Sequence, residues 1–322
     1  MAKATPIRIG TRESQLALWQ AQHVKDLLAV HQIESILVPI KSEGDIDLTT
    51  PLYAMGVQGV FTRSLDIALL NDTIDIAVHS MKDVPVQLPK TIVNAAVLSR
   101  ASYKDIFVIN TPYLAKRTGL TEQEVFENID KILEEKSISI ATSSVRRKAQ
   151  WLAKYPYHTI ENIRGNVNTR LQKLAESQWA GAIFAAAGLE RIQVRPTFSI
   201  DLDWMLPAPA QGAILVVAKE SNKEVLAACK LLNDEHTALE VDIERSFLSN
   251  LMGGCATPIS ALAKVIGDHV FLKASVTSLN GTKTLTVDIS RQLQEAKMIA
   301  NEAAKNIIDQ GGKELIQKMQ DE

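Results

Sequence analysis

Residues 137–147 read SISIATSSVRR, a short strand-like run that ends in hydroxyl side chains and two arginines. Residues 159–170 read TIENIRGNVNTR and repeat this arrangement, with a glycine and two further arginines after the strand-like run. Guanidinium groups stay charged and bind carboxylates or phosphates bidentately, while Ser, Thr and Asn side chains satisfy the remaining lone pairs. The two stretches therefore predict βαβ units that carry a site for a compact anion.

Short β-rich runs alternate with helical patterns from the amino terminus to about residue 220. Such alternation predicts α/β domains, in which helices cover both faces of parallel sheets. The strand-like runs are residues 7–10, 36–40, 74–79, 137–141, 159–163 and 182–186, and the apolar residues at helical spacing are Ala17, Ala21, Val24 and Leu28, then Val125, Ile129, Ile132 and Leu133.

The pattern changes after about residue 255. Gly267-Asp268 and Asn280-Gly281 are typical of hairpin turns between strands, and residues 293–310 form a helical pattern. The last part of the chain is therefore predicted to be a small α+β domain.

Composition narrows the classes of function. A chain of 322 residues with 46% hydrophobic content is long enough for two or three domains. Its net charge of −2 argues against a nucleic-acid partner, which usually needs a basic face. Because we find neither a signal-peptide pattern nor an apolar run of membrane-spanning length, we expect a cytoplasmic protein without a membrane partner.

Polar and charged motifs follow several predicted strands. Thr11-Arg12, residues 80–83, residues 142–147 and residues 164–170 each begin where a predicted strand stops. Ligands of open α/β sheets bind at the carboxyl ends of the strands, and the helix that follows favours anions at its first N–H groups. An isolated Arg-Arg pair usually lies on a solvated helix face, but four such coincidences favour an anion site.

Three residues near these strand ends have alternative interpretations. Asp83 is a candidate acid, base or stabiliser of a cation, or it caps a turn or pairs with Lys82. Ser14 is either the N-cap of a helix or a donor to a bound carboxylate. We interpret His79 as a strand-end histidine whose hydrogen bonds are satisfied.

The two cysteines, Cys229 and Cys255, differ in their surroundings. Cys229 lies in a helical pattern and is predicted to be a small buried hydrophobic residue. Cys255 follows two glycines on a predicted loop, which exposes a thiol more readily. The six histidines lack zinc-ligand spacing, and no Walker or dinucleotide-binding glycine motif occurs, so we predict neither a metal nor a nucleotide.

Over nearly its whole length the chain closely resembles the hydroxymethylbilane synthase family, also called the porphobilinogen deaminase family. The resemblance rests on motifs that occur in the same order as in the family. They are Thr11 to Ser14 with Leu16 to Gln20, His79 to Pro85, Thr142 to Arg147, Arg164 to Arg170, Ala187 to Arg191, Pro209 to Ala213, and Gly253-Gly254-Cys255 with Pro258.

The resemblance implies an enzyme that joins four porphobilinogen molecules head to tail, releases ammonia each time, and hydrolyses the product to hydroxymethylbilane. Its dipyrromethane cofactor is implied to be bound covalently through Cys255, and Asp83 is implied to be catalytic. The remaining site residues would bind the carboxylates of the cofactor and of the growing polypyrrole. They are Lys82, Ser143, Ser144, Arg146, Arg147, Arg170, Gly188 and Arg191 for the cofactor, and Arg12, Ser14, Gln20, Arg164, Gly165, Asn166 and Gln211 for the substrate.

The resemblance also implies a fold. It consists of two similar α/β domains resembling type II periplasmic binding proteins, plus a small C-terminal α+β domain that carries the cofactor cysteine. The domains would be residues 1–100 with 213–230, residues 106–206, and residues 236–322. We expect the chain to be a monomer.

Two regions depart from the family pattern. Gln58 replaces the lysine that is usual in a glycine-rich loop, and residues 112–136 are longer than in typical members, which we interpret as a surface elaboration. The competing function is a non-catalytic two-lobed anion-binding protein, since fold does not fix function. Such a protein needs neither a displayed thiol nor a carboxylate among arginines. A nucleic-acid-binding module is a third possibility, disfavoured by the net charge.

Overall fold

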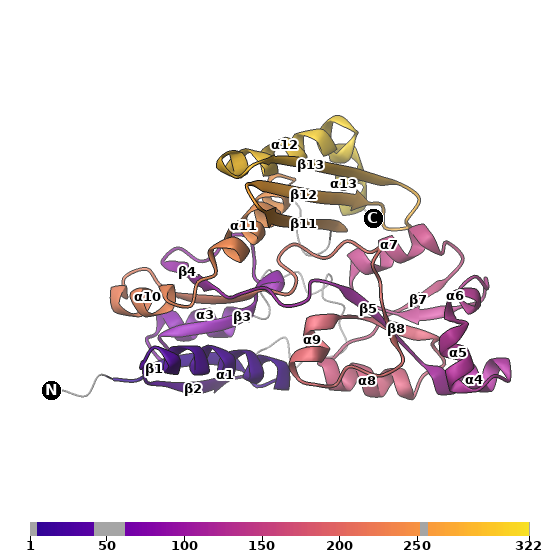
Figure 1. The fold of residues 1–322 in the computed structure, drawn as a ribbon, viewed down its shortest axis with the longest axis horizontal. Helices are drawn as coiled ribbons and strands as arrows, with labels where there is room; N and C mark the ends of the chain where they lie inside the picture. The colour runs from indigo at the N-terminus through magenta and orange to yellow at the C-terminus, as the bar shows by residue number, and fades with distance from the viewer. Residues whose placement is uncertain (1–4, 42–61, 252–256, 322) are drawn as a thin grey trace. The chain divides into compact units, whose positions relative to one another are not determined.

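The computed structural model describes residues 5–41, 62–251 and 257–321. The chain divides into two compact units. Of the described residues, unit 1 contains 5–41, 62–102 and Ala210–Asp242, and unit 2 contains Tyr103–Pro209, 243–251 and 257–321. Figure 1 shows the helices and strands of both units.

Unit 1 contains a five-stranded sheet with the order β2-β1-β3-β10-β4. The first three strands are parallel, and β10 runs antiparallel to both of its neighbours. Thus a strand from late in the chain lies between β3 and β4 (Figure 1). The elements are β1 (Ile7–Arg12), α1 (Gln15–Val30), β2 (Ser35–Ile40), α3 (Arg63–Leu70), β3 (Ile76–Ser80), the 3-10 helix η2 (Met81–Asp83), β4 (Ile92–Val97), β10 (Ile214–Lys219), α10 (Lys223–Lys230) and the start of α11 (Glu235–Asn250).

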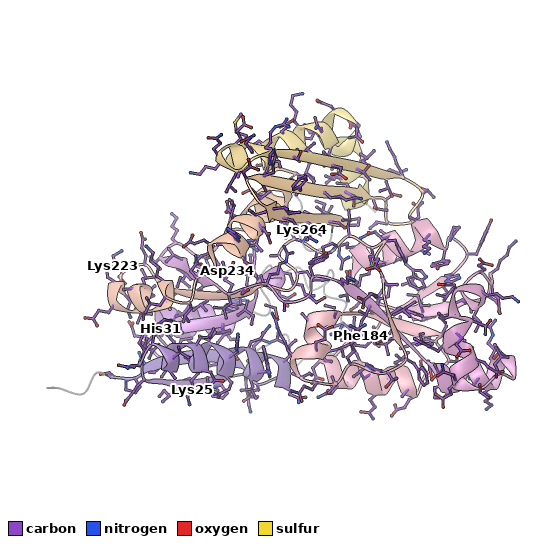
Figure 2. All side chains as sticks on the ribbon, viewed as in Figure 1. Lys25, His31, Phe184, Lys223, Asp234 and Lys264 are labelled. Atoms are coloured by element: carbon purple, nitrogen blue, oxygen red, sulfur yellow. The ribbon has the colours of Figure 1, made fainter. Side chains whose placement is uncertain are left out.

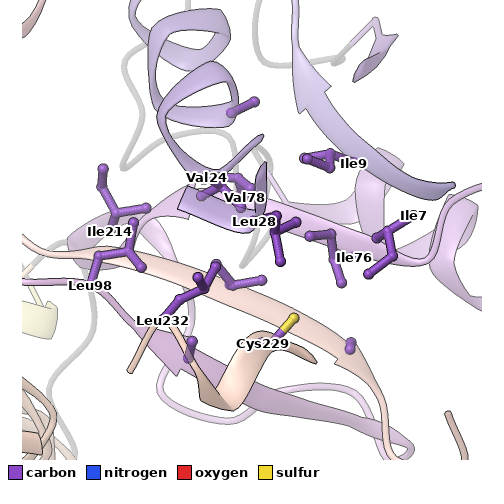
Figure 3. Packing of buried hydrophobic residues seen from close by; sticks show 14 of the residues in the cluster. Ile7, Ile9, Val24, Leu28, Ile76, Val78, Leu98, Ile214, Cys229 and Leu232 are labelled. Carbon is purple, nitrogen blue, oxygen red and sulfur yellow. The ribbon is translucent and has the colours of Figure 1, made fainter. Parts of the chain in front are cut away.

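Apolar residues cover both faces of this sheet. Alternate residues of β3 face opposite ways: Ile76 and Val78 pack with α1 and α10, whereas Ala77 packs with α3. Cys229 of α10 is fully buried in the first of these clusters, as Figure 3 shows. Burial raises the pKa of its thiol to about 12. The prediction that Cys229 acts as a buried hydrophobic residue is confirmed.

Unit 2 contains a second five-stranded sheet, with the order β7-β6-β8-β5-β9. Here β5 is the strand that runs antiparallel to both neighbours. The prediction of parallel sheets is therefore wrong, because each sheet has one strand inserted in the opposite direction. The elements of this part are β5 (Asp105–Ile109), α4 (Thr111–Thr118), α5 (Glu122–Glu127), α6 (Ile129–Ile132), β6 (Ser139–Ala141), α7 (Val145–Lys154), β7 (Thr159–Glu161), α8 (Val167–Ala175), β8 (Gly181–Ala185), α9 (Ala186–Arg191) and β9 (Ser199–Asp201).

The two five-stranded sheets correspond in register at one strand end. Ser80, the last residue of β3, pairs with Ile214, and the N–H of Met81 donates to the carbonyl of Ala213 over 3.1 Å. In unit 2, Ala185 ends β8 and pairs with Asp105, and the N–H of Ala186 donates to the carbonyl of Lys104 over 3.0 Å. Ser80 of unit 1 therefore corresponds to Ala185 of unit 2, and Ile214 corresponds to Asp105. Asp83 and Gly188 each lie three residues after the corresponding strand end, so they are equivalent too.

The segment of residues 112–136 belongs to the core of unit 2. Leu114, Val125 and Ile132 are at most 5% exposed and pack with Trp151. The interpretation of this segment as a surface elaboration is therefore wrong, because its three short helices bury the apolar face that covers the sheet.

The carboxyl-terminal part of unit 2 is a three-stranded antiparallel sheet with the order β11-β12-β13. Its hairpin turns lie at Gly267-Asp268 and Asn280-Gly281, as predicted, and both glycines have positive φ. A Cβ at Gly281 would lie 2.3 Å from the backbone nitrogen of Ala153, so this turn packs closely on α7. The elements are β11 (Ile259–Ile266), β12 (His269–Thr277), β13 (Thr284–Gln292), η3 (Leu293–Glu295), α12 (Ala296–Asp309) and α13 (Gly312–Asp321).

The structure thus has two similar α/β sheets and a small α+β part, which confirms the predicted fold class. The boundaries that we give for three domains stay a prediction. No helix in the described residues is long and apolar enough to cross a membrane.

Candidate active site

In unit 1, the end of β1 is fixed by hydroxyl groups. The hydroxyl of Thr11 donates to the carbonyl of Ala17 over 2.9 Å, and the hydroxyl of Ser14 accepts from the N–H of Ala17 over 3.3 Å. Ser14 is therefore the N-cap of α1. Arg12, the last residue of β1, is half-buried beside this cap.

The end of β3 gathers three predicted site residues of unit 1. The amide nitrogen of Gln20 donates to the hydroxyl of Ser80 over 2.9 Å. The ammonium of Lys82 donates to the side-chain oxygen of Gln211 over 3.2 Å. Gln20 and Gln211 are 2% and 1% exposed, so this strand end is built from buried amides.

Asp83 lies in the exposed part of the same turn. It is the last residue of η2, which separates β3 from the extended chain at Val84. Lys82 and Asp83 therefore follow the strand directly, and the carboxyl-bearing residue is open to a ligand. The exposed position agrees with a role in chemistry.

His79 differs from our interpretation. It is 6% exposed, and its Nε2 has no hydrogen-bond partner among the described residues. Burial and the positive charge of Arg12 lower the pKa of its imidazole to about 4. Within the described part of the chain, our interpretation of a histidine with satisfied hydrogen bonds therefore does not hold for Nε2, because β3 buries the ring without a partner for this atom.

In unit 2, hydroxyl groups fix the amino end of α7, which follows β6. The hydroxyl of Ser144 caps the helix by accepting from the N–H of Arg147 over 3.4 Å. The hydroxyl of Thr142 accepts from the N–H of Ser144 over 3.2 Å. Ser143 lies between them and is half-buried. This turn places Arg146 and Arg147 in the first turn of the helix.

The two arginines of α7 share one carboxylate, that of Asp105. Both Nε and Nη2 of Arg147 donate to Oδ1 of Asp105, over 2.9 and 2.7 Å. Oδ2 of Asp105 lies 2.7 Å from Nη1 of Arg146. Asp105 is fully buried, and the arginines are 5% and 6% exposed. The sequence analysis missed Asp105; its only signal is a charged residue that opens the otherwise apolar run DIFVI.

The amino end of α8 holds a second group of predicted residues. Asn166 caps the helix, since its side-chain oxygen accepts from the N–H of Thr169 over 2.9 Å. Gly165 has a φ of 115°, and a Cβ there would lie 2.7 Å from the side chain of Thr169. Arg164 is 7% exposed just before the cap. The glycine is thus required by the backbone of this turn.

Two further arginines of unit 2, Arg170 and Arg191, are predicted site residues. The guanidinium of Arg170 lies 5.2 Å from the ring centroid of Phe184, a residue of β8 that is labelled in Figure 2. Arg191 ends α9, the helix that contains Gly188, and burial lowers the pKa of Arg191 to about 10, although Glu190 acts in the opposite direction.

Gln150 connects α7 to the small sheet within unit 2. Its Nε2 donates to the carbonyl of Leu206 over 2.9 Å and to the hydroxyl of Ser260 over 3.0 Å, and its Oε1 accepts from the N–H of Leu206 over 2.8 Å. The carbonyl of Leu206 also accepts from Nη1 of Arg146 over 2.7 Å. The arginine helix is therefore tied to β11.

The structure brings the predicted residues together in two groups. Lys82, Asp83 and Gln211 lie at the strand ends of unit 1 with Arg12, Ser14 and Gln20. The arginines of α7, α8 and α9 lie at the strand ends of unit 2 with Ser143, Ser144, Gly165, Asn166 and Gly188. Two predicted residues, Cys255 and Gln58, lie outside the described residues. Within the described residues, no group of His, Cys, Asp and Glu is suited to hold a metal.

Comparisons with known proteins cover both units. Residues 7–227 match the family model described as porphobilinogen deaminase, dipyromethane cofactor binding domain, and residues 238–309 match porphobilinogen deaminase, C-terminal domain. A porphobilinogen deaminase of Campylobacter concisus (strain 13826) is 34% identical over 321 residues, covering 98% of each chain. That of Campylobacter curvus (strain 525.92) is 35% identical over 323 residues, again covering 98% of each. Among solved structures, the methionine binding protein MetQ aligns with 72% of this chain and 91% of its own, with 12% identity and a TM-score of 0.42.

Proposed function

This chain belongs to the porphobilinogen deaminase family, and we propose that the residues at its strand ends bind and extend a chain of pyrroles through their carboxylates. The enzyme is a transferase, a hydroxymethylbilane synthase. It joins four porphobilinogen molecules head to tail on a dipyrromethane cofactor, releases ammonia at each addition, and hydrolyses the product to hydroxymethylbilane. The alternative of a non-catalytic anion-binding protein is not favoured.

One observation carries the assignment of the binding residues: unit 2 buries guanidinium groups at the carboxyl ends of its strands. Arg146, Arg147 and Arg164 are each at most 7% exposed. Asp105 pairs with both Arg146 and Arg147, so one carboxylate faces two guanidinium groups at this strand end. Each pyrrole of the product carries an acetate and a propionate, so a bound polypyrrole is a polyanion. These residues fit such a ligand, since guanidinium and carboxylate pair in a bidentate geometry.

The cofactor, when bound, supplies the pyrrole carbon to which the next porphobilinogen is joined. Arg146, Arg147, Arg170 and Arg191 of unit 2 would hold its carboxylates and keep the pyrrole rings in a fixed position. Arg12, Arg164 and Gln211 would bind the carboxylates of the incoming porphobilinogen, and Lys82 would bind a carboxylate of the cofactor. Holding a reactant in the right geometry supplies part of the rate acceleration of an enzyme.

We assign the chemical step to Asp83. Asp83 is exposed just after the end of β3. A carboxylate there can stabilise the positive charge that develops on pyrrole nitrogens as ammonia leaves and the new bond closes. The same group can accept the proton that the pyrrole carbon releases after bond formation.

We propose Cys255 as the attachment site of the cofactor. Cys255 precedes Ser260 by five residues in the sequence, and five residues of extended chain reach about 17 Å at most. Ser260 is hydrogen-bonded to Gln150 on α7, one turn after Arg146. The thiol is therefore connected by a short stretch of chain to β11, which contacts the arginine helix α7. This supports Cys255 as the covalent attachment site of a ligand that the arginines of α7 hold.

The intact mass of the purified protein tests the proposal. The wild-type chain is expected to exceed its polypeptide mass by two pyrrole units, and Cys255→Ser is expected to show the polypeptide mass alone and no turnover. Cys229→Ala is the matched control, since its buried thiol has a pKa of about 12 and cannot react at neutral pH. It should keep the added mass. An added mass in Cys255→Ser would remove Cys255 from the proposal.

We also propose that the enzyme acts as a cytoplasmic monomer, which suits a biosynthetic enzyme whose ligands are small molecules. Size-exclusion chromatography with light scattering should give the mass of one chain at working concentrations. A stable dimer would contradict this assignment.

A further inference from the structure

Asp105 is a buried carboxylate between two buried guanidinium groups. Its Oδ1 accepts from two nitrogens of Arg147, and its Oδ2 lies 2.7 Å from Nη1 of Arg146. All three side chains lie in unit 2, on the first residue of β5 and the first turn of α7. One carboxylate therefore balances only one of the two positive charges.

The two arginines are held differently. All three nitrogens of Arg147 donate within the protein, since Nη1 reaches the carbonyl of Ile183 over 3.1 Å. Arg146 is held through Nη1, which also donates to the carbonyl of Leu206 over 2.7 Å. Its Nε is buried and has no hydrogen-bond partner among the described residues. The unmatched positive charge therefore belongs mainly to Arg146.

The fold itself does not require a carboxylate at this position. In the equivalent sheet of unit 1, Ile214 occupies the place of Asp105, at the start of the antiparallel strand and opposite the last residue of the neighbouring parallel strand. Ile214 is 2% exposed and packs in an apolar cluster. Well-packed apolar residues usually stabilise a core at least as well as a buried ion pair. The presence of Asp105 thus needs a reason other than stability.

We propose that Asp105 is a positioning residue for ligand binding. It neutralises Arg147 and holds both guanidinium planes, so that Arg146 keeps a net positive charge in a fixed orientation for a carboxylate of the pyrrole chain. This inference rests on the proposed function. It assigns to Asp105 no contact with the ligand; Asp105 acts through the two arginines.

Two substitutions test this role. Asp105→Asn keeps the shape and the acceptor for Arg147, but its amide nitrogen faces the donor of Arg146, which turns that guanidinium away. Asp105→Glu keeps the charge and displaces the carboxylate by one methylene. We expect both variants to raise KM for porphobilinogen on the order of tenfold to a hundredfold, because the bound pyrrole chain that Arg146 holds offers the end at which the next porphobilinogen docks, and a weakened charge-assisted contact displaces that end. We expect kcat to change less than KM.

The two variants separate positioning from simple charge compensation. If Asp105 only compensates charge, Asp105→Glu restores the wild-type KM, which would overturn the inference. A KM within twofold of the wild type in folded Asp105→Asn would also overturn it. Should Asp105→Asn fail to fold, Asp105→Glu alone decides: a raised KM supports positioning, and a wild-type KM refutes it. Thermal unfolding and circular dichroism establish which variants are folded.

Asp201→Asn is the matched control. Asp201 lies on β9, the strand next to β5, and is also shared by two cations, Lys104 and Arg195, but its side chain is 30% exposed. We expect a wild-type KM. The added mass and the turnover of the wild-type enzyme are measured first. A wild type that lacks both would contradict the proposed function, whereas an active wild type with an unaffected Asp105→Asn variant contradicts only the role of Asp105.

Discussion

The two five-stranded sheets share a topology but carry a carboxylate at different positions, each matched by an uncharged residue at the equivalent place in the other sheet. Three residues past β3, unit 1 has the exposed carboxyl group of Asp83, whereas unit 2 has Gly188 three residues past β8. Conversely, unit 2 begins its antiparallel strand with Asp105, where unit 1 has Ile214. One architecture therefore serves two tasks, and a few substitutions at strand ends separate the group that we assign to chemistry from the groups that we assign to binding.

The largest expected effect concerns the carboxylate that only unit 1 has at this strand end. Asp83→Asn should fold normally and lower the rate of elongation by about 10²–10⁴-fold, the usual loss when a positioned acid or base is removed. Single-turnover measurement of ammonia release from holoenzyme gives this rate. Asp72→Asn, which removes an exposed carboxylate paired with Lys219, is the control and should leave the rate unchanged. Near-normal turnover in Asp83→Asn would end its catalytic role.

A second variant transfers the buried carboxylate to the equivalent position of unit 1, where Ile214 packs in an apolar cluster. Ile214→Asp should destabilise the protein by about 3–5 kcal/mol at pH 7, because the charge is buried without a partner. Burial raises the pKa of such a carboxyl group above its unfolded value, so the loss should shrink as the pH falls toward 5. Ile214→Val, which loses one methylene, should cost about 0.5–1.5 kcal/mol at either pH. Denaturant unfolding at both pH values measures the free energies of unfolding of the two variants. If Ile214→Asp lost no more than Ile214→Val at pH 7, a carboxylate would be tolerated at this position of either sheet.

A third prediction concerns His79, which lies where unit 2 has Phe184. The pKa of about 4 in the folded state is below the ordinary value of 6.5, so between these values the unfolded chain binds a proton that the folded chain does not. The contribution of neutral His79 to the free energy of unfolding is complete above pH 6.5 and falls by about 3 kcal/mol as the pH drops to 4. In His79→Gln, the free energy of unfolding should lose this part of its pH dependence. An unchanged slope between pH 6.5 and 4 would mean that His79 already titrates normally.

The smallest expected effect is at the exposed counterpart of Asp105. Asp201→Asn should change the free energy of unfolding by less than about 1 kcal/mol, and the difference should diminish in high salt, because exposed ion pairs are screened. Thermal unfolding in low and high salt measures it. A loss of several kcal/mol would show that Lys104 and Arg195 depend on Asp201 as strongly as the arginines of α7 depend on Asp105.

Much of this arrangement can be predicted from the sequence, because strand ends and helix caps leave local signals. Residues 137–147 specify β6, the cap at Ser144 and the two arginines of α7 in a single run. The spacing of apolar residues indicates which strands are buried, but it does not indicate which strands pair with one another. The run ILVVAK of β10 is apolar on either side, and only its long-range pairing reveals that it runs antiparallel between β3 and β4.

Asp105 and His79 show a second limit of sequence-based prediction. The significance of Asp105 depends on arginines about forty residues later in the chain, and that of His79 on its burial beside Arg12. A carboxylate at the start of a strand and a histidine at the end of one are common in themselves. Their roles follow from three-dimensional neighbours that local patterns do not encode.

The position of β10 has a consequence for synthesis on the ribosome. Residues up to Ser102 contain four of the five strands of the unit 1 sheet, yet β4 pairs with the other three only through β10, Ile214–Lys219. A nascent chain that has just emerged to Ser102 therefore exposes two unpaired strand edges, and more than a hundred further residues must be translated before they close. During that interval the edges of β3 and β4 are open to chaperones and to aggregation.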